Sequence, residues 1–415
     1  MDFNLARGVD LHIIPTKQFK MNHVLIDFAT PQTPTNATAR NLLANLLETS
    51  THRYPTQTAL ARQLAALYGA YVNLYVNRLG KMHTVRLRAS FVNNRFVNED
   101  LFKKISDLIS EMLFHPLIDD GEFDGPTFRI QSNNLKSTIK SLYDDKQFLA
   151  NQRLMSLYYQ DDSVMRIPSF GQIADLDKLT AKSLVSTYRS MIDQDKVDIF
   201  VLGDIDPQLV QDVFGKLPFK DRAITSGSPL YHQLPYDQVQ RKTEYQQVSQ
   251  AKLNLAYSLP IYYHDQDYYA GLVFNGLFGG TPYSKLFTNV REKASLAYYA
   301  ASRLLPFTGI VSVQTGIQSS NQEKVQELIQ QQLREIQQGD FSTEVLKEVQ
   351  DSLINQYQAG HDLASNILEQ RLVAKLVNES NNDFIAEVKK VTSADVARVA
   401  KLMKLQAVYL LSGER

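Results

Sequence analysis

The chain has 415 residues, too many for one ordinary core, so its length predicts two or three folding units. Hydrophobic residues make up 44% and charged residues 21%, which is typical of a folded globular protein and excludes global disorder. The 44 Lys and Arg balance the 44 Asp and Glu, so the broad positive field that binds nucleic acid or anionic membranes is missing and we expect neither partner.

The first half of the chain opens with strands. Alternating apolar residues predict two adjacent strands in VDLHIIPT and HVLIDFAT, followed by helices over residues 36–49 and 56–68. AYVNLYVNR and KMHTVRLRASFV, joined at Leu79 and Gly80, have the pattern of a hairpin with one buried face. Further helices are predicted over residues 99–113, 123–159 and 181–191, before the apolar strand VDIFVLGDI. This order is that of a layered α+β unit.

The end of this unit is repeated at the end of the chain. LTAKSLVSTYRSMIDQDKVDIFVLGD and VTSADVARVAKLMKLQAVYLLSGE each combine a helix with a closing strand and a glycine. Thr180 and Thr392 can each cap their helix. We therefore expect a structural duplication, with halves at residues 1–217 and 246–415 and a linker rich in Pro, Ser, Gly and charge at residues 218–245.

The second half repeats the order of the first. A strand is predicted in AKLNLAYSLP, a helix over residues 265–277, a helix and a hairpin over residues 284–317, and helices from there to Lys404. The interruption QQGDFST, with Gly339 and a capping Ser342 or Thr343, favours two amphipathic helices packed on a sheet over one coiled coil. The opening residues lack the basic region and apolar run of a signal peptide. No stretch approaches the roughly 18 apolar residues of a membrane span, so we expect a cytoplasmic protein.

The most distinctive segment is FNGLFGGTPYSKLFTNVREKASLAYYAAS, residues 274–302. It resembles the part of insulinase/pitrilysin-type metallopeptidases in which a Gly-rich turn precedes a helix ending in REKxGLAY. The resemblance implies an α+β fold of two structurally duplicated domains, each a mostly antiparallel sheet with helices packed on one face, as in insulinase and mitochondrial processing peptidase.

The resemblance also implies substrate-binding residues. In that family a strand of the first half pairs with the extended peptide, while an Arg and a Tyr of the second half contact the peptide and the reacting carbonyl. They match Arg291 and Tyr298 here, with Tyr299 as the alternative if the strand register differs by one residue. A guanidinium can bind a peptide carbonyl and a phenol can stabilise an oxyanion. The competing interpretation makes Arg291 a solvated charge and Tyr298 a core residue.

The zinc motif of the family is missing. Active members carry HxxEH on the first helix, where two His bind zinc and the Glu activates water. In TARNLLANLLETSTHRYP, Asn41, Ala44 and Asn45 stand at those three positions. An Asn amide is a poor zinc ligand and Ala cannot take a proton from water.

The third zinc ligand of the family, a Glu on the long downstream helix, is also absent. The comparable segment FRIQSNNLKSTIKSLYDDK places Thr138 at the ligand position, and the sequence has no Glu between Glu122 and Glu244. The sequence has no Cys, and no two of its eight His have the spacing of a helical HxxxH pair. GDID at residues 203–206 has the pattern of a turn and helix cap, and Gly279 and Gly280 of a structural turn. We expect no metal, no cofactor and no catalytic residue in this chain.

Two functions are compatible with these features. The resemblance implies the noncatalytic subunit of a zinc peptidase pair, which would contribute peptide binding to an HxxEH-bearing paralogous partner that holds the zinc, with a homodimer in its absence. We expect no peptidase activity from the chain alone. The alternative is a peptide- or protein-binding scaffold without proteolysis, of the type that the family associates with elongation factor P modification.

Overall fold

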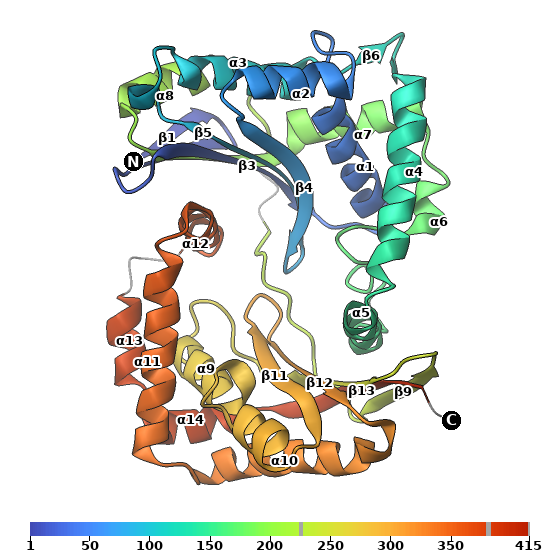
Figure 1. Cartoon of the computed structure of the whole chain (residues 1–415), viewed down its shortest axis with the longest axis vertical. Coiled ribbons are helices and arrows are strands. Elements are labelled where there is room, and N and C mark those ends of the chain that lie inside the picture. Colours follow the sequence, from blue (N-terminus) through green and yellow to red (C-terminus); the bar gives the residue numbers. More distant parts are fainter. Residues whose placement is uncertain (224–226, 379–382, 414–415) are drawn as a thin grey trace. The chain divides into compact units, whose positions relative to one another are not determined.

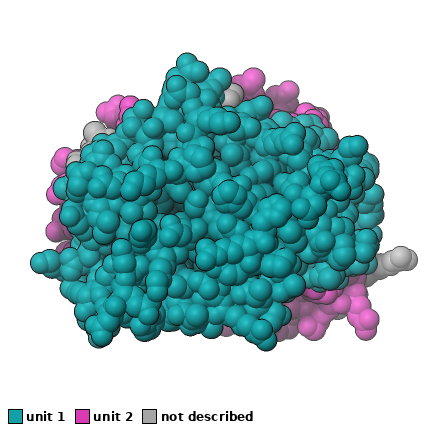
Figure 2. Space-filling view, turned by 90° about the horizontal axis from the view of Figure 1, so that it is seen from above, with its two compact units in different colours: residues 1–140, 167–227, 364–373 teal, residues 141–166, 228–363, 374–415 magenta. Residues whose placement is uncertain are grey.

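The computed structural model describes residues 1–223, 227–378 and 383–413, and its contacts divide the chain into two compact units (Figure 2). Unit 1 comprises residues 1–140, 167–227 and 364–373, and unit 2 comprises residues 141–166, 228–363 and 374–415. Each unit therefore contains a segment from the other half of the sequence. The repeat-based halves at residues 1–217 and 246–415 are a different division, which stays a prediction.

Unit 1 contains a six-stranded sheet in the order β1-β2-β8-β3-β5-β4. Its strands are β1 (Asp2–Ala6), β2 (Val9–Pro15), β3 (Met21–Pro31), β4 (Tyr71–Leu79), β5 (Met82–Val92) and β8 (Lys196–Gly203). The expectation that the first two predicted strands are adjacent is wrong, because β8 lies between β2 and β3, parallel to β2 and antiparallel to β3. The hairpin β4–β5 is confirmed, and β4 forms an edge of the sheet.

The two faces of this sheet differ in chemistry, since side chains alternate between the faces along each strand. One row of cross-strand neighbours is apolar and buried: Leu11, Ile199, Ile26, Leu87 and Leu74. The next row, on the opposite face, is polar: Asp10, Asp198, Asp27, Arg86 and Tyr75.

Helices of the first half pack on the apolar face. The helices that surround this sheet (Figure 1) are α1 (Asn36–Thr49), α2 (Gln57–Ala66), α3 (Leu101–Phe114), α4 (Gly125–Leu142), α6 (Ile173–Leu176), α7 (Ala181–Gln194) and α8 (Pro207–Phe214). The ring of Phe102 on α3 lies 6.1 Å from the rings of both Phe91 on β5 and Phe214 on α8. Asp206 caps α8, which confirms the helix cap predicted in GDID. A short hairpin, β6 (Ile118–Asp119) and β7 (Glu122–Phe123), precedes α4.

The single long helix predicted over residues 123–159 is wrong. The chain leaves α4 at Leu142 and begins a second helix, α5 (Lys146–Tyr158), in unit 2. The side chain of Asp145 accepts hydrogen bonds from the amides of Gln147 and Phe148 at 2.8 and 3.0 Å, so it caps the new helix. The apolar periodicity continues through the break because each helix buries its own face, and the sequence pattern therefore did not reveal that the helix ends at Leu142.

Unit 2 contains a five-stranded sheet in the order β11-β12-β10-β13-β9. Its strands are β9 (Gln240–Tyr245), β10 (Ala251–Ser258), β11 (Ala297–Leu305), β12 (Ile310–Ile317) and β13 (Lys404–Ser412). Strand β9 lies within the segment expected to be a linker, and it pairs parallel to β13. The other described pairs of this sheet are antiparallel.

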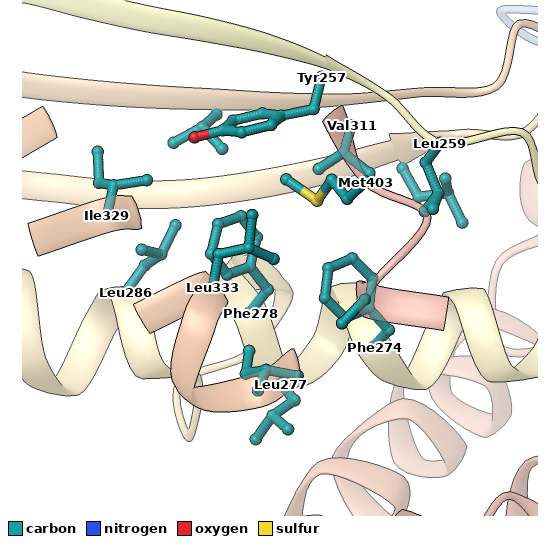
Figure 3. Close-up of a cluster of buried hydrophobic side chains, with 14 of the residues drawn as sticks. Tyr257, Leu259, Phe274, Leu277, Phe278, Leu286, Val311, Ile329, Leu333 and Met403 are labelled. Atoms are coloured by element: carbon teal, nitrogen blue, oxygen red, sulfur yellow. The ribbon is translucent and has the colours of Figure 1, made fainter. Parts of the chain in front are cut away.

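The main core of unit 2 lies between this sheet and helices of the second half. They are α9 (Tyr268–Asn275), α10 (Gln322–Gln338), α11 (Thr343–Gly360), α13 (Phe384–Lys390) and α14 (Ser393–Ala400). Helix α12 (Ala364–Leu376) follows α11 in the sequence, but its residues 364–373 belong to unit 1. In Figure 3, Phe274 and Phe278 lie below Tyr257 and Met403 in the buried cluster. Gly339 ends α10 with a φ of 77° and the Ser342 side chain caps α11, which confirms two separate helices.

Each sheet also receives one helix on its other face. Helix α5 packs against Ala256, Ala407 and Tyr409, whose side chains point away from the main core of unit 2. In unit 1, Glu369 of α12 contacts Arg86 on the polar face. These two helices add to the expected arrangement of helices on one face, and they are the segments that each unit takes from the other half of the sequence.

The expected fold class is confirmed as α+β with duplicated, mostly antiparallel sheets. Thr180 and Thr392 both form complete capping boxes at the helices that precede the closing strands β8 and β13. Across the described ranges, none of the helices combines the length and the apolar composition that crossing a membrane requires.

Candidate functional site

Helix α1 carries the three positions that correspond to HxxEH. Asn41 and Asn45 are partly buried, and Ala44 between them is completely buried. A spacing of four residues places Asn41 and Asn45 on one face of the helix, as a zinc-binding pair would require. The helix geometry of the expected site is therefore present, while its ligand chemistry is not.

The amide of Asn41 has a structural partner. Its Nδ2 donates a hydrogen bond to the carbonyl oxygen of Phe170 at 3.0 Å. The next residues of this segment also lie against α1, since the amide of Gln172 donates to the Thr38 hydroxyl at 2.9 Å. Gly171 has a φ of +82°, and a Cβ there would lie 2.5 Å from the Thr38 Cα. Asn41 thus acts as a hydrogen-bond donor that holds a closely packed segment against α1, whereas a metal ligand must donate a lone pair.

Helix α1 is anchored to the sheet by a buried arginine. The Arg40 guanidinium donates to the carbonyl of Phe28 at 2.8 Å and to Nδ1 of His83 at 3.1 Å, and it pairs with Asp195 at 2.6 Å. Burial and the nearby Arg40 charge lower the pKa of His83 to about 3. Three interactions with the sheet and the end of α7 therefore fix the position of the helix.

Thr138, at the place of the third ligand, lies on α4 and is exposed. Within the described ranges, no hydrogen bond joins Thr138 to Asn41 or Asn45. Zinc needs nitrogen, sulfur or carboxylate ligands that converge on one point. The four positions offer instead two amides, a buried methyl group and an exposed hydroxyl. The residues at these four positions do not fit the metal.

A group of potential metal ligands lies elsewhere in unit 1, on β2 and β8. Ligand atoms of Asp10, His12 and Asp198 lie within 4.8 Å of one another. However, both ring nitrogens of His12 are bonded to carboxylates, to Asp2 at 2.9 Å and Asp198 at 3.2 Å. The Lys196 ammonium lies 2.7 Å from the Asp198 carboxylate. Both His12 nitrogens and the Asp198 carboxylate are therefore already engaged by neighbouring side chains, and the cluster is a hydrogen-bonded ion-pair network of the sheet.

The edge strand β4 is the strand beside α1. The Glu48 side chain, at the end of α1, accepts hydrogen bonds from the amide of Leu74 at 2.8 Å and from Nδ2 of Asn73 at 3.0 Å. Burial raises the pKa of the Glu48 carboxyl, and the two hydrogen bonds oppose that rise. This edge strand of the sheet is thus in contact with a carboxylate of α1.

The distinctive motif of unit 2 forms two π-helical segments, η2 (Gly276–Gly280) and η3 (Leu286–Lys293). The turn expected at Gly279 and Gly280 is therefore a wide helical segment. Added Cβ atoms would lie 2.6 Å from the Ser302 amide nitrogen at Gly279 and 2.6 Å from Nδ2 of Asn275 at Gly280. Gly279 therefore allows η2 to pack directly against β11, while Gly280 allows a close approach to the end of α9. π-Helical segments are rare and occur often at functional sites.

Arg291 and Tyr298 are both exposed side chains of unit 2. The Arg291 guanidinium lies over the ring of Phe287, 4.6 Å from its centroid. Tyr298 is 62% exposed and lies where the pairing of β11 with β12 shifts register between Ala297 and Tyr299, so it is the extra residue of a β-bulge. Bulges redirect side chains and are frequent beside active sites. The position of Tyr298 is not that of a core residue.

Tyr299, the alternative to Tyr298, is engaged within unit 2. Its hydroxyl donates to Oε1 of Gln147 on α5, and the Lys252 ammonium lies 5.2 Å from its ring centroid. Burial raises the pKa of its phenol. Of the two tyrosines, Tyr298 is the one whose hydroxyl has access to a ligand.

Several residues that shape the site were not predicted from the sequence. Arg40 and His83 anchor α1, and Glu48 binds the β4 edge. Arg40 interrupts the apolar side of the predicted helix, which is the one signal in the sequence that it is held by partners. Glu48 had no such signal, because a glutamate near the end of a helix is ordinary.

Comparison with known proteins identifies related sequences. The family described as "Peptidase M16 inactive domain" matches residues 178–353. A Bacillus subtilis (strain 168) protein named "Probable inactive metalloprotease YmfF" is 34% identical over 413 residues, covering 98% of this chain and 96% of its own length. A second protein of that strain, "Uncharacterized zinc protease YmxG", is 22% identical over 306 residues, covering 72% of this chain and 69% of its own.

A solved structure agrees with the fold over the full length. The crystal structure of a conserved protein from Enterococcus faecalis V583 has a TM-score of 0.94 and 38% sequence identity. The similarity covers 100% of this chain and 98% of that one.

Proposed function

The chain belongs to the insulinase/pitrilysin-type (M16) metallopeptidase family as an inactive member that lacks the zinc motif, and from this premise we propose that it is the noncatalytic subunit of a zinc peptidase pair. In this proposal an HxxEH-bearing paralogue supplies the zinc and the activated water. This chain contributes peptide binding through Arg291, Tyr298 and the β4 edge.

The observation that carries the proposal is the asymmetry between two sets of residues. The positions for zinc and base hold Asn41, Ala44, Asn45 and Thr138, which cannot act on water. The positions for substrate hold an exposed arginine and an exposed tyrosine on a bulge next to a π-helical segment. The exposure of both side chains leaves their hydrogen-bonding groups accessible to a peptide.

The relatives support the choice of partner. One bacterial strain has both a protein named as an inactive metalloprotease and a protein named as a zinc protease that are similar to this chain. A cell that makes an inactive member can therefore also make a paralogue named as a zinc protease.

Cleavage of an unfolded peptide tests the pair directly. Carboxymethylated insulin B chain is incubated with this chain, with the HxxEH-bearing paralogue of the same cell, and with both. We expect no cleavage by this chain alone and cleavage on mixing. Replacing Tyr298 by Phe is expected to lower kcat/KM of the mixture about 100-fold, since it removes a donor to the developing oxyanion. Arg291→Ala is expected to lower it about tenfold, since it removes a charged donor to the peptide.

Two variants of unit 2 serve as controls for these losses. Tyr283→Phe removes the hydroxyl of another exposed tyrosine, 46% exposed, and Arg303→Ala removes an exposed arginine of β11. Both should leave cleavage unchanged. Zinc-dependent cleavage by this chain alone would overturn the proposal. Inactivity of the mixture and of both separate chains would instead favour the scaffold function, which needs binding without cleavage.

The contribution of the β4 edge is tested by a proline. Backbone groups alternate sides along a strand, and the amide of Leu74 points away from β5 toward Glu48. Val76 lies two residues after Leu74, so its N–H also points away from β5. Val76→Pro therefore removes an outward N–H while the hydrogen bonds between β4 and β5 stay intact. We expect the affinity for labelled insulin B chain to fall about tenfold, as for one lost backbone hydrogen bond.

Fluorescence anisotropy measures this affinity, and circular dichroism checks that the fold is retained. Val76→Thr changes the same side chain but keeps the N–H, so it should bind the peptide as the wild type does. Equal affinities of the folded Val76→Pro variant and the wild type would exclude edge pairing at this strand.

A further inference from the structure

The β4 edge has only a limited set of groups that an added strand can use. Residues 72, 74, 76 and 78 turn their backbone groups away from β5, because hydrogen-bonding groups alternate along an antiparallel strand. The structure shows this orientation at two of them. The amide of Leu74 donates to Glu48, and the amide of Arg78 donates to the neighbouring Asn77 side chain at 2.8 Å.

Glu48 reaches this edge from the helix of the lost zinc site. It lies four residues after Ala44 and three after Asn45, so the three side chains share one face of α1. Its Oε2 accepts both hydrogen bonds, from the Leu74 amide and from the Asn73 side chain. The carboxylate therefore takes the place that the carbonyl oxygen of an extended peptide would occupy opposite Leu74.

We propose that Glu48 is an autoinhibitory contact, which occupies the backbone donor of Leu74 and must leave it before an extended peptide can pair along the full length of β4. The inference rests on the proposed function, since it concerns the same peptide edge. A carboxylate is a stronger acceptor than a peptide carbonyl, so the incoming peptide exchanges a charge-assisted hydrogen bond for a neutral one at this position. Peptides pair at Val76 first and extend past Leu74 only when Glu48 is displaced.

The contact itself is tested by amide hydrogen exchange. In the free chain we expect the Leu74 amide to exchange at least about tenfold more slowly than the Val76 amide, because only Leu74 has Glu48 as an acceptor. Glu48→Ala should abolish this difference, while Glu48→Gln, whose amide oxygen can still accept the hydrogen bond, should retain part of it. Equal exchange of the two amides in the wild type would overturn the contact.

The effect on peptide binding is measured with labelled insulin B chain. Glu48→Ala is expected to bind about tenfold more tightly than the wild type, and Glu48→Gln to lie between them. The matched control is Glu111→Ala, since Glu111 also accepts a hydrogen bond from a backbone amide of unit 1, that of Arg53 at 2.9 Å, away from β4. That variant should bind as the wild type does.

The outcomes separate this inference from the proposed function. Tighter binding by Glu48→Ala that is lost on adding Val76→Pro supports both. Binding that is sensitive to Val76→Pro but unaffected or weakened by Glu48→Ala leaves the peptide edge in place and overturns the role of Glu48. Absence of binding by every variant, including Glu48→Ala, overturns edge pairing and autoinhibition together.

Discussion

Replacing Arg86 by Met is expected to lower the free energy of unfolding by about 3–5 kcal/mol, which would be among the largest single effects in unit 1. The Arg86 Nε donates to Asp27 at 2.6 Å, and both side chains are at most 1% exposed. Burial raises the pKa of Asp27 and the arginine charge opposes that rise, while the nearby Asp198 adds repulsion. Without Arg86, the Asp27 carboxylate is left buried beside a second carboxylate.

The second variant identifies the cause of this loss. Asp27→Asn in the Arg86→Met background removes the uncompensated charge, so the double variant should be more stable than Arg86→Met alone. The unfolding free energies of the two single variants should therefore not add up to that of the double variant. Arg88→Met is the matched control. Arg88 is 32% exposed and contacts Glu369 at 3.3 Å, and its loss should cost at most about 1 kcal/mol. Urea unfolding, with hydrogen exchange at β3 and β5 to localise the change, measures each effect. Equal losses for Arg86→Met and Arg88→Met would contradict the explanation.

Local signals in the sequence were sufficient for most elements of the fold. Residues 36–49 were predicted as a helix and form α1 with the same limits, because the apolar spacing and the flanking polar residues all agree. The caps at Thr180 and Thr392 were predicted from residue type and are present in both units. The duplicated α+β architecture followed from these local features and from the repeat.

Long-range topology was not encoded in such signals. The insertion of β8 between β2 and β3, and the transfer of α5 to unit 2, depend on contacts between segments far apart in the sequence. Hydrophobic periodicity shows only that a helix has a buried face and does not show which sheet covers it. The break at residues 143–145 therefore looked like a continuous helix.

The same limit applies to the candidate site. The prediction that Asn41, Ala44 and Asn45 cannot hold zinc needed only the sequence, because ligand chemistry depends on residue type. The β-bulge that exposes Tyr298 could not be predicted from the sequence, because it arises from the pairing of β11 with β12. The use of Glu48 as a partner of the β4 edge likewise required coordinates, since nothing in ANLLETS distinguishes a carboxylate bound to a backbone amide from one in water.

His83 is expected to make the wild-type chain sensitive to acid. Its Nδ1 accepts a hydrogen bond from Arg40 at 3.1 Å and its Nε2 lies 2.9 Å from the carbonyl of Ser169, so the folded state requires a neutral ring with the proton on Nε2. Burial and the charges of Arg40 and Arg78 lower its pKa from 6.5 to about 3. Below pH 6.5 the unfolded chain takes up a proton that the folded chain does not, so this contribution to stability is present above pH 6.5 and is lost as the pH falls toward 3.

The variant His83→Gln isolates this effect, because its side chain can accept from Arg40 and donate to Ser169 without titrating. Between pH 8 and pH 5 the wild type should lose about 2 kcal/mol more of its free energy of unfolding than the variant does. His52→Gln, which changes an exposed histidine of unit 1, should follow the wild-type profile. Parallel profiles of wild type and His83→Gln in urea unfolding across this range would mean that the buried ring is not the titrating group. A difference confined to His83→Gln would show that the anchor of α1 depends on a neutral imidazole.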